Sequence, residues 1–327
     1  PRSTLFPYTT LFRSRILNLG LQELIRVNGL EPENISPYHI GFVLGPCLNA
    51  SGRLDTAKRA LKLLLAETRE EAAVLAGDLK NLNESRKEMT AQGVEKAIEQ
   101  VESTSMMEDT VLVVFLPECH ESLAGIIAGR LRERYHKPSF VLTRGEEGVK
   151  GSGRSIEAYS MYEKLCECKE YLTKFGGHPM AAGLSLEEEN VETFRRKLNE
   201  RSGLSQEDLV EKVSIDVPMP IHYIRKDLVR ELSLLEPFGK GNEKPLFAQK
   251  NLWISQLRVF GKNRNVVKMR LTDENGYPMD GVYFGDGDAF AEEARGKQKI
   301  AIVYYPDINV YQGRESLQVI IRHYQFD

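Results

Sequence analysis

The segment FGGHPMAAGLS (175–185) carries residues suited to chemistry on a phosphate. Gly176 and Gly177 would let the backbone approach a ligand closely, and His178 follows them directly. An imidazole there can donate a hydrogen bond to a phosphate oxygen or act as an acid or base. The alternative is a loop histidine whose hydrogen bonds are satisfied within the protein. His178 is our candidate catalytic residue, and the two glycines are candidate phosphate-binding residues.

A second segment, KGSGRS (150–155), combines hydroxyl groups with a guanidinium on a glycine-rich backbone. Ser152, Arg154 and Ser155 are the donors. Arginine and hydroxyl donors together suit a terminal phosphate or a backbone phosphate. A glycine-rich hairpin turn would explain the segment equally well.

The third segment, GPCLNASGRLDTAKRAL (45–61), predicts a glycine-rich turn followed by a helix. Backbone N–H groups at a helix N-terminus favour anions, and a nearby arginine adds a bidentate donor. Asn49 and Arg53 are therefore candidate phosphate-binding residues. The alternative is an ordinary helix cap with a solvated arginine.

Basic and aromatic residues alternate near the segment RVFGKNRNVVKMR (258–270), which contains no acidic residue. Such a mixture on a small barrel is typical of a surface that binds a single nucleic-acid strand. A solvated strand edge protected by lysine is the alternative. The candidate DNA-binding residues are Trp253, Arg258, Phe260, Lys262, Arg264, Lys268 and Arg270.

Other potential sites are weaker. Cys166 and Cys168 would lie about 200° apart on a helix, and no second cysteine pair accompanies them. The segment GDGD (285–288) is typical of a turn. We predict no metal ligand in this chain, and a P-loop, a dinucleotide-binding fingerprint and a serine-nucleophile elbow are all missing from the sequence.

The N-terminal part of the chain predicts helices. Apolar spacing indicates helices at 16–27 and 38–44, then the glycine-rich turn and a third helix. Thr68 and Glu71 have capping-box spacing, and an apolar stripe follows them without a strong break. A helix of about 34 residues would span about 50 Å. We interpret it as a strut between domains that ends in the polar segment 103–109.

Strand and helix patterns alternate after residue 110, which indicates an α/β domain. Strands are expected at 110–116 and 138–143, and helices at 122–135, 159–175 and 191–198. After residue 206 the pattern changes to one helix (226–235) and five short strands, which suggests a small β-barrel or sandwich. These strands are expected at 252–260, 266–271, 278–284, 299–305 and 316–322.

Composition agrees with a globular protein that can bury a core: 327 residues, 41% hydrophobic and 28% charged. The formal net charge of −3 provides no overall basic field, so any DNA affinity must come from local basic patches. No apolar run is long enough to cross a membrane. Four cysteines do not make a disulfide scaffold and favour a reducing, cytoplasmic location.

The first fourteen residues, PRSTLFPYTTLFRS, are interpreted as an artefact and not as part of the native protein. They match, codon for codon, the translation of a widely used short-read sequencing adapter. A signal peptide would need an unbroken apolar core, which Pro7 and Thr9 interrupt. We expect the native polypeptide to start near Arg15 and an upstream part to be missing.

Five segments together resemble the RecJ family of the DHH/DHHA1 phosphoesterase superfamily, whose members are single-stranded-DNA-specific exonucleases. The segment GGHPMAAG alone would indicate only a DHHA1 domain, whereas LEPFGKGN followed by five strands is similar to the OB-fold that RecJ adds. In chain order the segments are GPCLNASGRL (45–54), SLAGIIAGRLRERYHKPSFVL (122–142), KGSGRS (150–155), KFGGHPMAAGLS (174–185) and LEPFGKGNEKPLF (235–247).

This resemblance implies an α/β DHHA1 domain and a small OB-fold barrel, joined by a long helix to the tail of a DHH domain. The implied boundaries are an adapter-like segment at 1–14, the DHH remnant at 15–67, the long helix at 68–108, DHHA1 at 109–205 and the OB-fold at 206–327. It also implies that Ser152 and Arg154 hold a 5′ phosphate, that His178 faces the scissile phosphate, and that Asn49 and Arg53 reach the substrate.

The family resemblance implies degradation of single-stranded DNA from its 5′ end, in recombination and repair, by a monomer with single-strand-binding protein as a further partner. Mn²⁺ or Mg²⁺ would serve the intact enzyme, held by aspartates and histidines of the DHH domain that are missing from this chain. We therefore expect the chain alone to be inactive. Two alternatives remain: a non-catalytic module that binds single-stranded DNA, and a phosphodiesterase acting on oligoribonucleotides or cyclic dinucleotides.

Overall fold

A computed structural model describes residues 18–145, 148–239 and 241–327. The adapter-like segment 1–14 lies outside the described residues. The chain divides into two compact units, one ending at Glu211 and the other running from Lys212 to Asp327. None of the described helices is long and apolar enough to cross a membrane.

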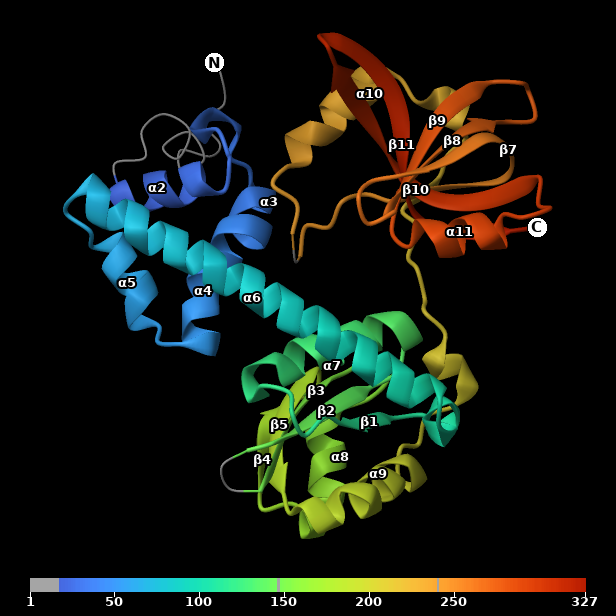
Figure 1. The fold of residues 1–327 in the computed structure, drawn as a ribbon. Helices are drawn as coiled ribbons and strands as arrows, with labels where there is room; N and C mark the ends of the chain where they lie inside the picture. The colour runs from blue at the N-terminus through green and yellow to red at the C-terminus, as the bar shows by residue number, and fades with distance from the viewer. Residues whose placement is uncertain (1–17, 146–147, 240) are drawn as a thin grey trace. The chain divides into compact units, whose positions relative to one another are not determined.

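The described part of the first unit starts with a group of short helices around one core (Figure 1). They are α2 (Leu19–Val27), α3 (Pro37–His39), a π-helical segment (Ile40–Leu44), α4 (Gly45–Leu54) and α5 (Lys58–Leu64). Asn18 caps α2 by accepting a hydrogen bond from the Leu21 amide at 2.9 Å. Apolar side chains of these helices, including Leu24, Cys47 and Leu63, are buried against the next helix.

The predicted turn at 45–54 is wrong, because this segment forms helix α4. Pro46 lies in the first turn of the helix, where its missing N–H costs nothing. Cys47, Ala50 and Ser51 are buried, and their contacts against the long helix outweigh the poor helix propensity of glycine. Ser51 donates its hydroxyl to the Leu48 carbonyl at 3.0 Å, so it is not a free donor.

Helix α6 (Arg69–Glu102) confirms the predicted 34-residue helix. The Thr68 hydroxyl accepts from the Glu71 amide at 3.2 Å, as the capping pattern predicted. Its N-terminal half packs against the short helices through Ala72 and Leu79. Its C-terminal half contributes Ala97 and Val101 to the core of the following α/β domain, so one helix joins two cores.

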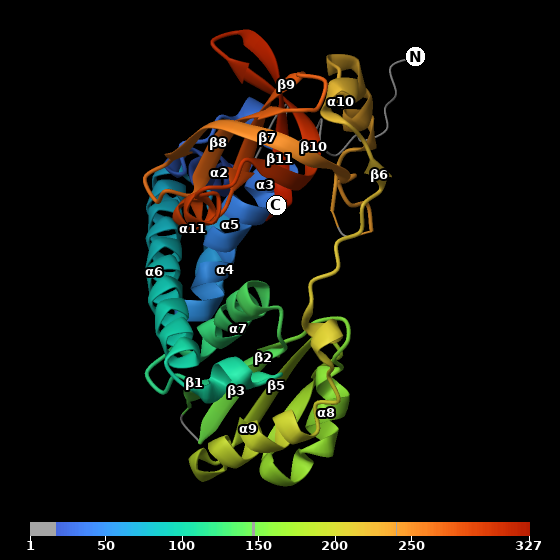
Figure 2. The ribbon, with the colours of Figure 1, turned by 90° about the vertical axis from the view of Figure 1, so that its right-hand side faces the viewer.

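The α/β domain contains a five-stranded sheet in the order β1-β2-β3-β5-β4. Strands β1 and β2 are parallel and the other neighbours are antiparallel. Helix α7 packs on one face with the end of α6, while α8 and α9 cover the other (Figures 1 and 2). The bounds are β1 (Leu112–Phe115), α7 (Glu121–Tyr135), β2 (Ser139–Arg144), β3 (Val149–Arg154), α8 (Met161–Glu167), β4 (Lys174–His178), β5 (Ala181–Leu186) and α9 (Val191–Glu200).

KGSGRS and FGGHPMAAGLS, for which the sequence analysis expected no strand, contribute strands to this sheet. The predicted helix 159–175 is correspondingly shorter, since its last residues enter β4. Glycine is required in β3 by packing: a Cβ on Gly153 would lie 2.6 Å from the Phe140 ring, and one on Gly151 2.3 Å from Leu142. Large side chains of β2 fill the space that the glycines leave.

The second unit is a closed barrel, which confirms the predicted OB-fold. Strands follow the order β10-β11-β9-β8-β7-β6, and pairing of β10 with β7 closes the barrel. The bounds are β6 (Val217–Pro218), α10 (Lys226–Leu232), β7 (Phe247–Phe260), β8 (Val266–Thr272), β9 (Pro278–Phe284), α11 (Gly287–Glu293), β10 (Lys299–Tyr311) and β11 (Arg314–Phe326).

Short 3-10 turns occur in both units. They lie at Pro32–Asn34, Ser105–Glu108, Lys169–Tyr171, Glu188–Asn190, Gln206–Leu209, Ile221–Tyr223 and Ser233–Leu235.

Helix α11 was not predicted, because GDGD was interpreted as a turn. Asp286 in fact caps this helix, its carboxylate accepting from the amides of Asp288 and Ala289 at 3.1 and 3.0 Å. Phe290 of α11 is fully buried in the barrel core. A turn composition and a helix N-cap use the same residue types, and burial of Phe290 decides between them.

Candidate functional site

Polar and glycine residues line up across β3, β5 and β4. Arg154 pairs in register with Ala181, which pairs with His178. In the next row, Ser152 pairs with Gly183, which pairs with Gly176. Residues directly opposite each other point to the same face of a sheet, and Arg154 contacts α7. The sheet therefore brings Ser152, Arg154 and His178 to the face that α7 partly covers.

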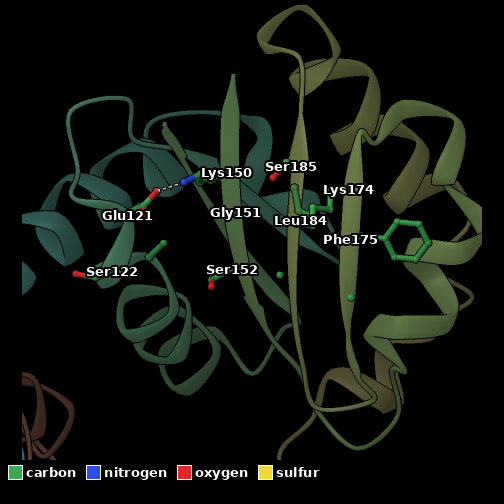
Figure 3. A pocket seen from close by; sticks show the side chains of 12 residues that line it. Glu121, Ser122, Lys150, Gly151, Ser152, Lys174, Phe175, Leu184 and Ser185 are labelled. Carbon is green, nitrogen blue, oxygen red and sulfur yellow. Dashed lines mark hydrogen bonds and ion pairs between the residues drawn. The ribbon is translucent and has the colours of Figure 1, made fainter. Parts of the chain in front are cut away.

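Beyond the N-terminal end of α7 this face is hollowed into a pocket of about 490 Å³ (Figure 3). Lys150 reaches across it to Glu121 at 2.7 Å, and Ser152 and Ser185 carry hydroxyls on the adjacent strands (Figure 3). The lining residues are Glu121, Ser122, Ala124, Lys150, Gly151, Ser152, Lys174, Phe175, Gly176, Gly183, Leu184 and Ser185. Lysines, hydroxyls and glycine backbone together suit an anionic ligand.

Arg154 has no carboxylate partner among the described residues. Its Nη1 donates to the neighbouring Gly153 carbonyl at 2.7 Å. Burial lowers the pKa of this arginine, and the positive charges of Arg53 and Arg132 lower it further. A guanidinium in this position remains charged but is poorly neutralised, so an anion bound here would be stabilised.

His178 is exposed at the end of β4. Its Nδ1 accepts from the Met180 amide at 3.3 Å, so in the neutral imidazole the proton is assigned to Nε2, which can donate outward. Gly177 makes this hairpin end possible, because a Cβ there would lie 2.4 Å from the Ala181 carbonyl oxygen. Gly176 has open space around it and lines the pocket.

The structure does not bring every candidate to this surface. Ser155 is buried, and its hydroxyl donates to the Tyr159 carbonyl at 2.5 Å, so it has no free donor for a ligand. Asn49 and Arg53 lie one turn apart on the exposed side of α4. Arg53 Nη1 donates to the Ser122 carbonyl at 2.7 Å, which joins α4 to the start of α7. Asn49 does not line the pocket.

Sequence reasoning missed Lys150, Lys174 and Ser185. Each belongs to a segment that was singled out, but no strand was expected in those segments. In a strand, side chains alternate between faces, so Lys150 shares a face with Ser152 and Arg154. Recognition of KGSGRS as a strand would have revealed this third residue.

The outer face of the barrel carries a second groove, of about 270 Å³, on β7, β8, β9 and the β10–β11 hairpin. Four of the seven candidate DNA-binding residues line it: Arg258, Phe260, Lys268 and Arg270. The Lys268 ammonium lies 5.9 Å from the centre of the Phe260 ring. Gln256, Met269, Asp280, Gly281, Val282, Asn309, Ser316 and Gln318 complete the lining.

The remaining candidates lie elsewhere. Arg264 is paired with Asp288 of α11, with Nη2 at 2.6 Å from the carboxylate, and its charge is therefore neutralised. Lys262 lies exposed in the turn between β7 and β8. Trp253 is outside the groove, and the Lys299 ammonium lies 4.7 Å from its ring. Within the groove, Arg270 forms an ion pair with Asp280.

Among the described ranges, no three His, Cys, Asp or Glu side chains are arranged so that they could hold a metal ion. The cysteines Cys47, Cys119, Cys166 and Cys168 are all unpaired thiols. The residues that the structure describes do not fit a divalent-metal centre.

Comparison with known proteins identifies one domain in each unit. The family model described as the DHHA1 domain matches residues 108–203, and that of the RecJ OB domain matches residues 215–323. The chain is 35% identical over 312 residues, 94% of its length, to the single-stranded-DNA-specific exonuclease RecJ of Bacillus subtilis (strain 168). It is 33% identical over 314 residues, 92% of its length, to the RecJ of Escherichia coli (strain K12). The chain belongs to the RecJ family.

A crystal structure of RecJ from Thermus thermophilus in complex with Mg²⁺ superposes on 94% of this chain with a TM-score of 0.80 and 26% sequence identity. A crystal structure of exonuclease RecJ bound to manganese covers 58% of the chain with a TM-score of 0.51 and 29% identity. The chain corresponds to 39% of the B. subtilis RecJ, 54% of the E. coli RecJ and 46% of the Thermus chain. It therefore spans about half the length of the relatives it matches, and carries the DHHA1 and OB domains of a RecJ.

Proposed function

We propose that this chain is the substrate-holding part of a RecJ-type exonuclease that degrades single-stranded DNA from the 5′ end, in recombination and repair. The observation that supports this is the shared face of β3, β5 and β4 in a RecJ-family chain. On this face lie a serine, an exposed histidine and an arginine that has no carboxylate partner among the described residues. We propose further that it acts in the cytoplasm as a monomer, with single-strand-binding protein as a partner.

The proposed terminal-phosphate site consists of Arg154, Ser152 and the pocket beside them. Arg154 would donate through its guanidinium and Ser152 through its hydroxyl, two donors that match the oxygens of a phosphate. His178 would donate from Nε2 to a non-bridging oxygen of the neighbouring phosphate. Glycines at 176 and 183 leave the strand backbone open to close approach.

The barrel groove is the proposed binding surface for the strand beyond its 5′ end. Lys268 and Arg258 would contact phosphates, and Phe260 offers a ring on which a base can stack. Stacking is tolerant of sequence because every base has an aromatic face. This combination fits an exonuclease that removes nucleotides of any sequence.

Divalent metal use by the intact enzyme is part of the proposal, supported by RecJ relatives whose crystal structures hold Mg²⁺ or Mn²⁺. The described residues of this chain do not fit such a centre. We therefore propose that the chain alone binds single-stranded DNA without cleaving it.

The test uses the purified 327-residue chain with a 5′-phosphorylated, fluorescently labelled single strand of DNA and Mn²⁺. We expect salt-dependent binding and no release of mononucleotides. Release above the level of a His178→Ala variant would contradict the proposed inactivity. Tighter binding to short RNA than to DNA of the same length would instead favour a phosphodiesterase that acts on oligoribonucleotides.

A further inference from the structure

Among the described arginines of the first unit, three have no carboxylate partner. Within the described residues up to Glu211, every arginine except Arg53, Arg86 and Arg154 has a carboxylate oxygen within 4.0 Å. Leaving a half-buried charge such as that of Arg86 or Arg154 without a partner is costly. The exceptions are therefore informative, and one of them, Arg86, belongs to no motif of the sequence analysis.

These three arginines form one cluster across α4, α6 and α7. Arg53 extends from α4 and donates to the Ser122 carbonyl at the start of α7, while Arg154 lies against Gly125 one turn further along that helix. The charge of Arg53 lowers the pKa of both Arg86 and Arg154, after the larger effect of burial in each case. Arg53 is thus near both of the others.

Arg86 is held in position by a buried amide. Its Nε donates to Asn83 Oδ1 at 3.1 Å, and Asn83, which is 2% exposed, donates in turn to Cys47 Sγ at 3.5 Å. This contact uses Nε, and neither terminal nitrogen of Arg86 has a hydrogen-bond partner in the described part of the chain, so both can bind a ligand. An arginine whose orientation is fixed in advance loses less side-chain entropy on binding.

Space for a ligand lies beside Arg86. A groove of about 500 Å³ runs between α6 and α7, with Arg86, Lys87 and Arg130 among its lining residues. Near the cluster, the buried Nε of Arg132 has no hydrogen-bond partner among the described residues. Lys87 and Arg130 are each paired with a glutamate of their own helix, Glu84 at 2.9 Å and Glu133 at 3.0 Å, so Arg86 is the cation of this lining without a carboxylate partner among the described residues.

We propose that Arg86 binds an internal phosphate of the substrate strand, one or two linkages from the 5′ terminal phosphate held by Arg154, with Arg53 between the two. This inference rests on the proposed function, and adds a residue and a phosphate subsite to it. Adjacent phosphates bound by adjacent guanidiniums would compensate for the mutual repulsion of the three arginines.

The test titrates fluorescently labelled single-stranded DNA oligonucleotides with the 327-residue chain and follows the fluorescence anisotropy of the DNA. The oligonucleotides carry either a 5′ phosphate or a 5′ hydroxyl. A second set replaces one of the first three internal phosphates with an uncharged methylphosphonate. We expect Arg86→Gln to weaken binding by about tenfold and to lower the salt slope by about 0.7, the value for one phosphate of a single strand. The loss of affinity caused by Arg86→Gln should persist with the 5′-hydroxyl oligonucleotide. It should disappear with one of the methylphosphonate oligonucleotides, because the phosphate that Arg86 binds is already uncharged there.

Two controls locate the effect. Arg154→Gln should weaken binding of the 5′-phosphorylated strand but not of the 5′-hydroxyl strand. This difference separates the terminal-phosphate subsite from the subsite of Arg86. Arg59→Gln, which removes an arginine paired with Asp55 and Asp78, should leave affinity within about twofold. If Arg86→Gln does not fold, Arg86→Lys keeps the charge but loses the planar fork, and should give a smaller loss at the same linkage.

Each result has a distinct meaning. An Arg86→Gln variant that binds all oligonucleotides normally, or that weakens all of them equally, including every methylphosphonate, would overturn the assignment while leaving the proposed function intact. Failure of the unaltered chain to bind any single strand would overturn the proposed function, and this inference with it.

Discussion

The guanidinium of Arg154 lies directly against the backbone of Gly125, so that a Cβ on that glycine would be 2.7 Å from Nη2. Gly129, one turn further along α7, lies below the stem of the same side chain, with a Cβ position 3.9 Å from Cγ. The two glycines form a shallow channel on the helix in which the arginine lies. The position of the proposed phosphate donor is therefore set by residues on another element.

Gly125→Ala should displace the Arg154 guanidinium and reduce the preference of the chain for a 5′ phosphate. Charge-assisted hydrogen bonds contribute about 1.5–3 kcal/mol, so we expect the affinity ratio between 5′-phosphorylated and 5′-hydroxyl strands to fall by about tenfold. Helix stability should not suffer, because alanine favours a helix more than glycine does. Anisotropy titrations of both strands measure the ratio.

Gly77→Ala in α6 is the matched control, since a Cβ there has nothing within 4 Å. It should raise the free energy of unfolding by about 0.5–1 kcal/mol and leave the ratio unchanged. An unaltered ratio in Gly125→Ala would show that Arg154 does not need this channel to bind a phosphate.

In the barrel groove, Lys268→Ala should weaken binding of single-stranded DNA more than Arg264→Ala. Lys268 lines the groove beside Phe260, whereas Arg264 is already neutralised by Asp288. We expect Lys268→Ala to lower the salt slope by about 0.7 and Arg264→Ala to change it little. Titrations at several salt concentrations measure both slopes, and equal slopes for the two variants would contradict the groove assignment.

Stability of the barrel should depend on pH through Asp273. Burial raises the pKa of this carboxyl, but hydrogen bonds from the Tyr277 amide, His222 and the Asn275 amide together hold it below its usual value. A lowered folded-state pKa stabilises the fold above the unfolded-state pKa of about 3.9, and this stabilisation is lost as pH falls through the folded-state value.

Asp273→Asn should therefore be less stable than the unaltered chain at pH 7, by about 1–3 kcal/mol, and the difference should narrow below about pH 4. Urea unfolding followed by tryptophan fluorescence measures this directly, because the single tryptophan of the chain, Trp253, lies in the barrel. A stability difference that stays constant between about pH 7 and pH 3 would exclude the charge of Asp273 as its cause.

Local sequence patterns determined much of this protein. The Thr68 cap and the apolar stripe behind it were sufficient to predict α6, and alternating patterns located the five barrel strands. Ser152, Arg154 and His178 could be singled out from their types and glycine-rich surroundings, and the motif order indicated the RecJ family. These features depend on residues close together in the chain, which a local pattern records.

Only the tertiary structure decided which segments are strands and which charges are free. Gly153 belongs in a strand because Phe140 of the neighbouring strand fills its space, and the glycine-rich segment alone does not contain that information. Arg264 is neutralised by an aspartate 24 residues away, although its own segment has no acid. Arg53, Arg86 and Arg154 become a cluster only because three helices and a strand meet there. Coulomb energy depends on distance in space, and distance along the chain does not predict it.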